Sequence, residues 1–152
     1  MRNVAIFALV AAITGYPLVV SADSANANLS PAGIWATDDG ESRIQIEACG
    51  NELCGKIIWL KDPFEKDGAE AVDSENPDTQ LRTRRLIGLT ILGGFTPDRS
   101  DPKLWGSGWI YNPDNGKTYS CNLRLEGPES LRVRGYIGLP IFGVSQIWSR
   151  VK

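Results

Sequence analysis

The feature that most constrains the fold is a strict alternation of polar and apolar residues in short runs. In residues 118–126, one face carries Tyr119, Cys121, Leu123 and Leu125, and the other face is polar. Residues 131–137 repeat the pattern after the sequence Gly-Pro-Glu-Ser, which is a turn signal. A period of two residues is that of a β-strand with one buried face. These two runs therefore predict a β-hairpin.

Similar runs recur along most of the chain and are separated by turn signals. A helical period is not sustained anywhere, although residues 81–92 have room for a turn or two of helix. About eight short strands at even spacing favour an all-β sandwich or barrel. The expected strands are 33–37, 43–48, 53–60, 89–96, 104–111, 118–126, 131–137 and 143–151.

The long connection over residues 61–80 is rich in acidic residues, and connections of this length are usually functional or mobile. Two carboxylates can hydrolyse a glycoside, and clustered oxygens can bind calcium. No residue pattern fixes a catalytic pair or matches a calcium loop, so both functions rank low. The acids are Asp62, Glu65, Asp67, Glu70, Asp73, Glu75 and Asp78.

The 152 residues include no histidine, which excludes Ser-His-Asp and Cys-His relays and any His-ligated metal. The length suits one domain. A formal net charge of -2 provides no strong attraction to nucleic acid. We therefore expect a protein that is not an enzyme and has no cofactor or metal.

The N-terminal segment predicts a secretory signal peptide. An arginine precedes the apolar run 4–13, and small residues then offer cleavage after Ala22 or after Ala27. The apolar run is shorter than the ~20 residues that span a bilayer. We expect residues 1–22 to be removed, which leaves one exported domain over residues 23–152 without a transmembrane segment.

The three cysteines divide into a pair and a single residue. Cys49 and Cys54 flank four residues; if these form a hairpin loop, the two cysteines face each other and can form a disulfide. A zinc or redox site is the weaker alternative, because the spacing lacks a second pair or the C-x-x-C arrangement. Cys121 lies on an apolar face, so we expect a buried, inert thiol.

The ends of the expected barrel carry Gly33-Ile34-Trp35 and Trp148-Ser149-Arg150. A G-x-W start and an arginine in the last strand resemble the lipocalin, or calycin, signature. In that superfamily the tryptophan packs at the closed end of an eight-stranded barrel and the arginine lies across it. The resemblance implies structural roles for Gly33, Trp35, Trp148 and Arg150. A guanidinium over an indole contributes about 0.5–2 kcal/mol.

Longer motifs between these ends resemble the domain of unknown function 2147 family, whose members are small exported bacterial proteins with a lipocalin-like barrel. The resemblance covers most of residues 23–152 and implies the bacterial periplasm or the cell exterior. One departure is Arg85, where the family often has proline. The motifs are Cys49-Gly50, Leu53-Cys54-Gly55-Lys56-Ile57, Asn76-Pro77, Leu86-Ile87-Gly88-Leu89, Gly94-Phe95, residues 108–119, Arg134-Gly135-Tyr136 and Trp148-Ser149-Arg150.

An eight-stranded barrel has room for packed side chains or for one small ligand. The inward faces are apolar, three glycines leave space, and Tyr119 offers a hydroxyl group. A collapsed core that binds nothing is the open alternative. The predicted lining is Ile44, Ile46, Leu123, Leu125, Leu131, Val133 and Ile137, and the glycines are Gly106, Gly108 and Gly135.

Aromatic and basic residues supply further candidates. Trp59, Trp105, Trp109, Tyr111 and Tyr136 either line a mouth or act as ordinary cross-strand stabilisers. Arg82, Arg84 and Arg85 either hold a carboxylate or phosphate of a ligand, or pair with Asp73, Glu75 and Asp78.

The leading hypothesis is an exported, non-enzymatic barrel that binds a small apolar or amphipathic molecule. The alternative is a structural or protein-interaction module of the bacterial cell envelope, with a protein partner there. The candidate ligand-binding residues are Trp59, Trp109, Tyr111, Tyr119, Arg82 and Arg84.

Overall fold

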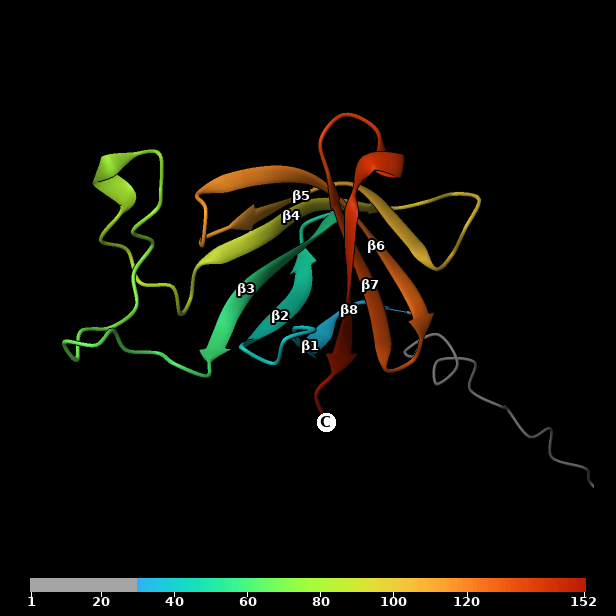
Figure 1. Cartoon of the computed structure of the whole chain (residues 1–152). Coiled ribbons are helices and arrows are strands. Elements are labelled where there is room, and N and C mark those ends of the chain that lie inside the picture. The colour runs from blue at the N-terminus through green and yellow to red at the C-terminus, as the bar shows by residue number, and fades with distance from the viewer. Residues whose placement is uncertain (1–29) are drawn as a thin grey trace, which may run out of the picture.

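The computed structural model describes residues 30–152, so the predicted signal peptide and both cleavage sites lie outside the described residues. Eight antiparallel strands follow one another around a closed barrel (Figure 1). The strands are β1 (Gly33–Ala36), β2 (Ser42–Cys49), β3 (Glu52–Leu60), β4 (Thr90–Pro97), β5 (Leu104–Asn112), β6 (Lys117–Gly127), β7 (Ser130–Tyr136) and β8 (Val144–Arg150).

The predicted all-β barrel of eight antiparallel strands is confirmed. First and last strands close it through two residue pairs, Trp35 with Arg150 and Ala36 with Ser149. The helix considered for residues 81–92 is absent; a single 3-10 turn, η1 (Thr79–Leu81), ends at the first residue of that range. A second 3-10 turn, η2 (Pro140–Phe142), lies between β7 and β8.

The β2–β3 hairpin carries the predicted disulfide between Cys49 and Cys54. The prediction of a four-residue loop is wrong, because the pairing of β2 with β3 continues to Cys49 and Glu52 and leaves only two residues in the loop. Gly50 has a φ of 68°, a conformation that glycine adopts without steric cost. The two cysteines are therefore diagonal neighbours, with Cα atoms 5.8 Å apart.

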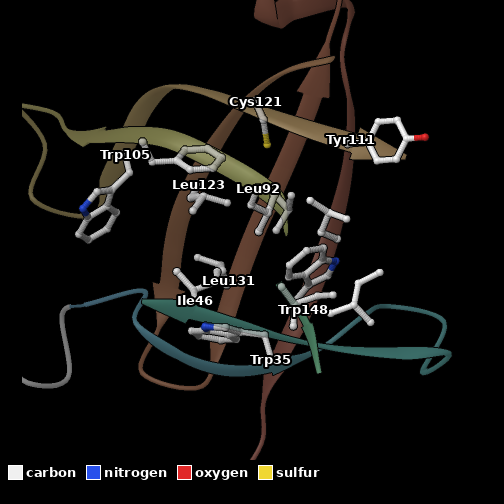
Figure 2. Packing of buried hydrophobic residues seen from close by; sticks show 14 of the residues in the cluster. Trp35, Ile46, Leu92, Trp105, Tyr111, Cys121, Leu123, Leu131 and Trp148 are labelled. Atoms are coloured by element: carbon white, nitrogen blue, oxygen red, sulfur yellow. The ribbon is translucent and has the colours of Figure 1, made fainter. Parts of the chain in front are cut away.

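The barrel has two different ends. Residues 30–32 and the β2–β3, β4–β5 and β6–β7 turns lie at the closed end, and the four other connections lie at the open end. Large buried side chains fill the closed half (Figure 2). Six predicted lining residues are buried, but only Val133 borders the cavity described below; the other five are packed in the core, namely Ile44, Ile46, Leu123, Leu125 and Leu131.

Three predictions about the interior are wrong. Gly106 leaves no space in the interior, because it does not line the cavity and a Cβ there would lie 3.6 Å from the Asn122 side chain. Ile137 is 73% exposed because β7 ends at Tyr136 and Ile137 already belongs to the β7–β8 loop. Gly108 leaves no space, since the ring of Phe95 occupies the position that its side chain would take. Gly135 does leave space: a Cβ there would lie 3.5 Å from the nearest side-chain atom, which is ordinary van der Waals contact.

The β3–β4 connection runs from residue 61 to residue 89 and is longer than the predicted 61–80. Two isolated bridges fold it onto itself, Phe64 with Glu70 and Val72 with Arg85. The Gly88 amide donates to the Ile57 carbonyl at 2.7 Å, which ties the end of the connection to β3. This connection therefore has a defined path over the open end.

Candidate functional site

A cavity of about 460 Å³ occupies the half of the barrel nearer the open end. Its apolar wall comes from β3, β4, β5, β7, β8 and the β3–β4 connection. Trp35, Phe95 and Trp105 do not line it, because they belong to the packed half. The apolar lining consists of Ile57, Leu60, Leu86, Ile91, Ile110, Val133, Val144 and Trp148.

Trp148 is the indole that faces the cavity. Its side chain is almost fully buried, and its Nε1 donates a hydrogen bond to Oε1 of Gln146 at 2.9 Å. In Figure 2 it lies between Trp35 and Tyr111. Because its ring lines the cavity, its fluorescence is a natural reporter of a guest molecule.

The rim of the cavity is polar, and every charged residue in the lining is acidic: Asp39, Glu41 and Asp114. The backbone amide of Glu41 and the hydroxyl of Thr37 donate to Asp39 and lower the pKa of its carboxyl. Glu41 forms an ion pair of 2.8 Å with Lys61. The rim therefore presents negative charge at neutral pH.

Tyr111 lines the cavity, but the β3–β4 connection already holds its hydroxyl. The Tyr111 Oη donates to Oδ1 of Asp73 at 2.6 Å and accepts from Nδ2 of Asn76 at 3.1 Å. Asn76 and Arg84 also donate to Oδ2 of Asp73, at 2.7 and 2.8 Å. Asp73 has no exposed surface, so this network fixes the connection to the barrel.

Two opposing effects set the pKa of Asp73. Burial raises it, and the hydrogen bonds from Tyr111, Asn76 and Arg84, with the charge of Arg84, outweigh burial, so the pKa is lowered. Tyr111 shifts upward, since burial and then the neighbouring Asp73 carboxylate raise its pKa. Asp73 is ionised and Tyr111 is neutral across the physiological pH range.

The arginines predicted as ligand contacts do not line the cavity. Arg84 pairs with Asp73 at 2.8 Å, which is the alternative that the sequence also offered. Arg82 donates to the Asn76 carbonyl at 2.7 Å, and Arg85 pairs with Glu70. All three guanidinium groups bind parts of the β3–β4 connection.

Two predicted tryptophans lie outside the cavity. Trp59 is half-exposed beneath Arg43, whose guanidinium is 4.7 Å from the ring centre. Trp109 packs on Gly93, its cross-strand partner. Tyr119 does line the cavity, and its hydroxyl accepts a hydrogen bond of 3.1 Å from Asn115. Of the six candidate ligand residues, the structure brings only Tyr111 and Tyr119 to the cavity.

The sequence interpretation missed much of the wall and the acidic rim. Three wall residues, Ile57, Ile91 and Ile110, lie in strands where the register shifts or where polar and apolar residues alternate less regularly. The sequence therefore did not show that their side chains point inward. Leu86 comes from the long connection, where period-two patterning does not apply. The only sequence pattern that pointed to burial of Leu86 was the short apolar run Leu86-Ile87.

The closed end has the geometry that the lipocalin resemblance implied. The Arg150 guanidinium lies 4.2 Å from the centre of the Trp35 ring and donates to the carbonyls of Ala32, Ser30 and Pro128. Gly33 has a φ of 140°, and a side chain there would overlap Arg150. This cluster closes the barrel end opposite the cavity.

Cys121 is fully buried, and burial raises the pKa of its thiol to about 12. Within residues 30–152, no three His, Cys, Asp or Glu side chains are grouped to hold a metal ion. None of the helices in this part of the chain has the length and apolarity needed to cross a membrane.

Comparisons with known proteins agree with this architecture. The model of a family described as "Uncharacterized protein conserved in bacteria" (DUF2147) matches residues 33–150. A search of curated proteins gives no match. Among solved structures, protein HP1028 from Helicobacter pylori, described as belonging to the lipocalin family, is similar with a TM-score of 0.68. The sequences are 21% identical, and the match covers 81% of this chain and 84% of HP1028, so this likeness shows the fold. The family match spans most of the chain, which therefore belongs to the domain of unknown function 2147 family of bacterial proteins.

Proposed function

We propose that this protein is exported to the bacterial periplasm or cell exterior and binds one small apolar or amphipathic molecule without transforming it. The observation that carries the proposal is the cavity of about 460 Å³, which combines an apolar wall with a polar rim at one open end. Ligand pockets typically measure about 300–1,000 Å³ and have this division between wall and orienting groups.

The charge of the rim narrows the class of ligand. Its carboxylates repel an anionic head group and attract a cationic one, while the wall accepts an alkyl or ring system. An amphipathic molecule with a neutral or cationic head therefore fits better than a fatty acid.

A binding role also agrees with the state of the buried reactive groups. Asp73 accepts hydrogen bonds from three side chains and is held in the ion pair with Arg84. The raised pKa of Cys121 keeps its thiol protonated, and a protonated thiol is a poor nucleophile. Both groups contribute to the fold and neither is poised as an acid, base or nucleophile.

The test is a titration with three ligands that share one alkyl chain and end in an ammonium, a hydroxyl or a carboxylate group. We expect tryptophan fluorescence to report saturable binding, with the carboxylate the weakest ligand. Gly135→Val places a side chain in the cavity, whereas Gly106→Val adds the same group outside it, where a Cβ would lie 3.6 Å from Asn122. Binding that survives Gly135→Val, or the absence of binding by all three ligands, contradicts the proposal.

The second candidate is an interaction module of the cell envelope. The observation that favours it is a group of exposed apolar side chains on the β7–β8 loop. On this view, Gly135→Val leaves the role of the protein in the cell intact, because the cavity is not used. Complementation of a deletion strain with Gly135→Val separates the two candidates.

A further inference from the structure

The β7–β8 loop exposes the most accessible apolar side chains in residues 30–152. Its five large apolar residues are between 63% and 77% exposed, and outside the loop only Phe64, at 61%, comes close. A contiguous exposed apolar patch on a folded domain marks an interaction surface. The residues are Ile137, Leu139, Ile141 and Phe142 of the loop and Val144, the first residue of β8, which together we call the apolar loop.

Hydrogen bonds satisfy part of the backbone of the apolar loop. The amides of Phe142 and Gly143 donate to the carbonyls of Leu139 and Pro140 at 3.1 and 3.0 Å. Arg134 lies beneath the loop and donates to the carbonyls of Pro140 and Ile141 at 2.7 and 3.2 Å. A segment whose backbone groups are paired in this way can leave water at low cost, which is a requirement for entering lipid.

The shape and charge of the apolar loop favour a lipid phase over a flat protein surface. Residues 135–149 contain no charged side chain. Figure 1 shows the loop projecting beyond the neighbouring strands, and its exposed apolar residues stand before, within and after η2 in the sequence. A flat partner covers one side of such a projection, whereas fluid lipid surrounds it. Burying this apolar surface drives association in proportion to its area.

The apolar loop is also continuous with the cavity. Val144 is 76% exposed and at the same time lines the cavity, beside Gly135. We propose that the apolar loop inserts into the surface of an uncharged lipid bilayer and that the ligand passes between the bilayer and the cavity at this point. The docking stands on the loop alone, and the passage of ligand rests on the proposed function.

The neighbouring charges identify the lipid class. The β1–β2 loop lies at the same end of the barrel and carries Asp38, Asp39 and Glu41, of which Glu41 is paired with Lys61. These carboxylates offset the cationic Arg134 beneath the apolar loop, so this end has no net attraction for an anionic surface. We therefore expect binding to zwitterionic vesicles that does not increase when anionic lipid is added. Because apolar burial drives it, binding is also insensitive to salt.

The experiment measures co-sedimentation of the protein with phosphatidylcholine vesicles. The full chain is produced in a bacterial host and purified, and intact mass verifies that all variants share one N-terminus. Phe142→Ser should weaken vesicle binding about tenfold, since it removes one exposed aromatic side chain from the inserted surface. Phe64→Ser is the matched control, because Phe64 is similarly exposed but lies beside Glu65 and Asp67; it should change binding less than about twofold.

Three results overturn the docking proposal: no sedimentation of the unmodified chain, equal loss in both variants, or a dimer that Phe142→Ser dissociates without any vesicle binding. The last result assigns the apolar loop to a contact between two copies. Titration of soluble short-chain ligands without vesicles tests the cavity separately. Ligand binding without vesicle binding refutes only the docking, and vesicle binding without ligand binding refutes only the proposed function.

Discussion

The two ends of the barrel use similar residues for different purposes. At the closed end, Trp35 is fully buried, and Arg150 covers its ring and donates to three backbone carbonyls. Trp148 lies two residues before Arg150 in β8 and is buried too, but its side chain also borders the cavity that opens at the other end. The closed end holds the barrel together, so the open end can remain incompletely filled.

The largest expected effect concerns the closed end. Trp35→Ala removes a fully buried indole and leaves Arg150 without its aromatic partner, so we expect a loss of about 3–5 kcal/mol in the free energy of unfolding. Urea denaturation measures it. The folded fraction should retain the ligand preference of the unmodified protein, because Trp35 does not line the cavity. If the ligand preference of Trp35→Ala differs from that of the unmodified protein, the two ends of the barrel do not act independently.

A smaller effect is expected for Asp73→Asn at the open end. The amide cannot accept the same charged hydrogen bonds from Tyr111 and Arg84, and we expect a loss of about 2–3 kcal/mol at pH 7. Arg84 is partly exposed, which keeps the value below that of a fully buried pair. This variant should also weaken ligand binding, because the β3–β4 connection supplies Leu86 to the cavity.

The same variant has a pH signature. The pKa of Asp73 is lowered in the folded protein, so its contribution is complete above the ordinary carboxyl pKa and is lost as the pH falls through the lowered value. The difference in stability between the unmodified protein and Asp73→Asn should therefore shrink below about pH 4. Denaturation curves at pH 7 and pH 3 measure it, and a constant difference contradicts the assignment.

The alternating pattern was sufficient for the strands, because it depends on the direction of side chains within a regular strand, whereas the closed end was expected from the resemblance of Gly33, Trp35 and Arg150 to the lipocalin signature. The pattern could not predict that Phe95 fills the space beside Gly108, since that depends on the three-dimensional path of two neighbouring strands. Nor could it predict the burial of Asp73, which long-range hydrogen bonds to Tyr111 create. The sequence therefore predicted that the candidate site is an apolar interior, but it did not predict most of the residues at the rim.

The disulfide tests how independent the closed end is. Replacing both Cys49 and Cys54 with serine removes a cross-link over a short loop, for which the chain-entropy model gives about 2 kcal/mol. Urea denaturation of the double variant measures the loss. Ligand binding should be unchanged, because the β2–β3 turn lies at the opposite end from the cavity. If the double variant binds ligand more weakly under conditions where it is fully folded, the cavity is not independent of the closed end.

The smallest effect is expected on the outer surface, where Trp59 provides a comparison with the inner Trp148. Trp59 is half-exposed and contacts Arg43 by a cation–π interaction, which at such sites contributes about 0.5–1 kcal/mol. Trp59→Leu should lower stability by no more than that amount and should leave ligand-induced changes in fluorescence intact. Trp148→Phe should instead abolish most of the change, because the indole at position 148 faces the guest. If Trp59→Leu removes the signal and Trp148→Phe does not, the ligand binds on the outer surface, and the difference between a packed closed end and an open cavity does not explain binding.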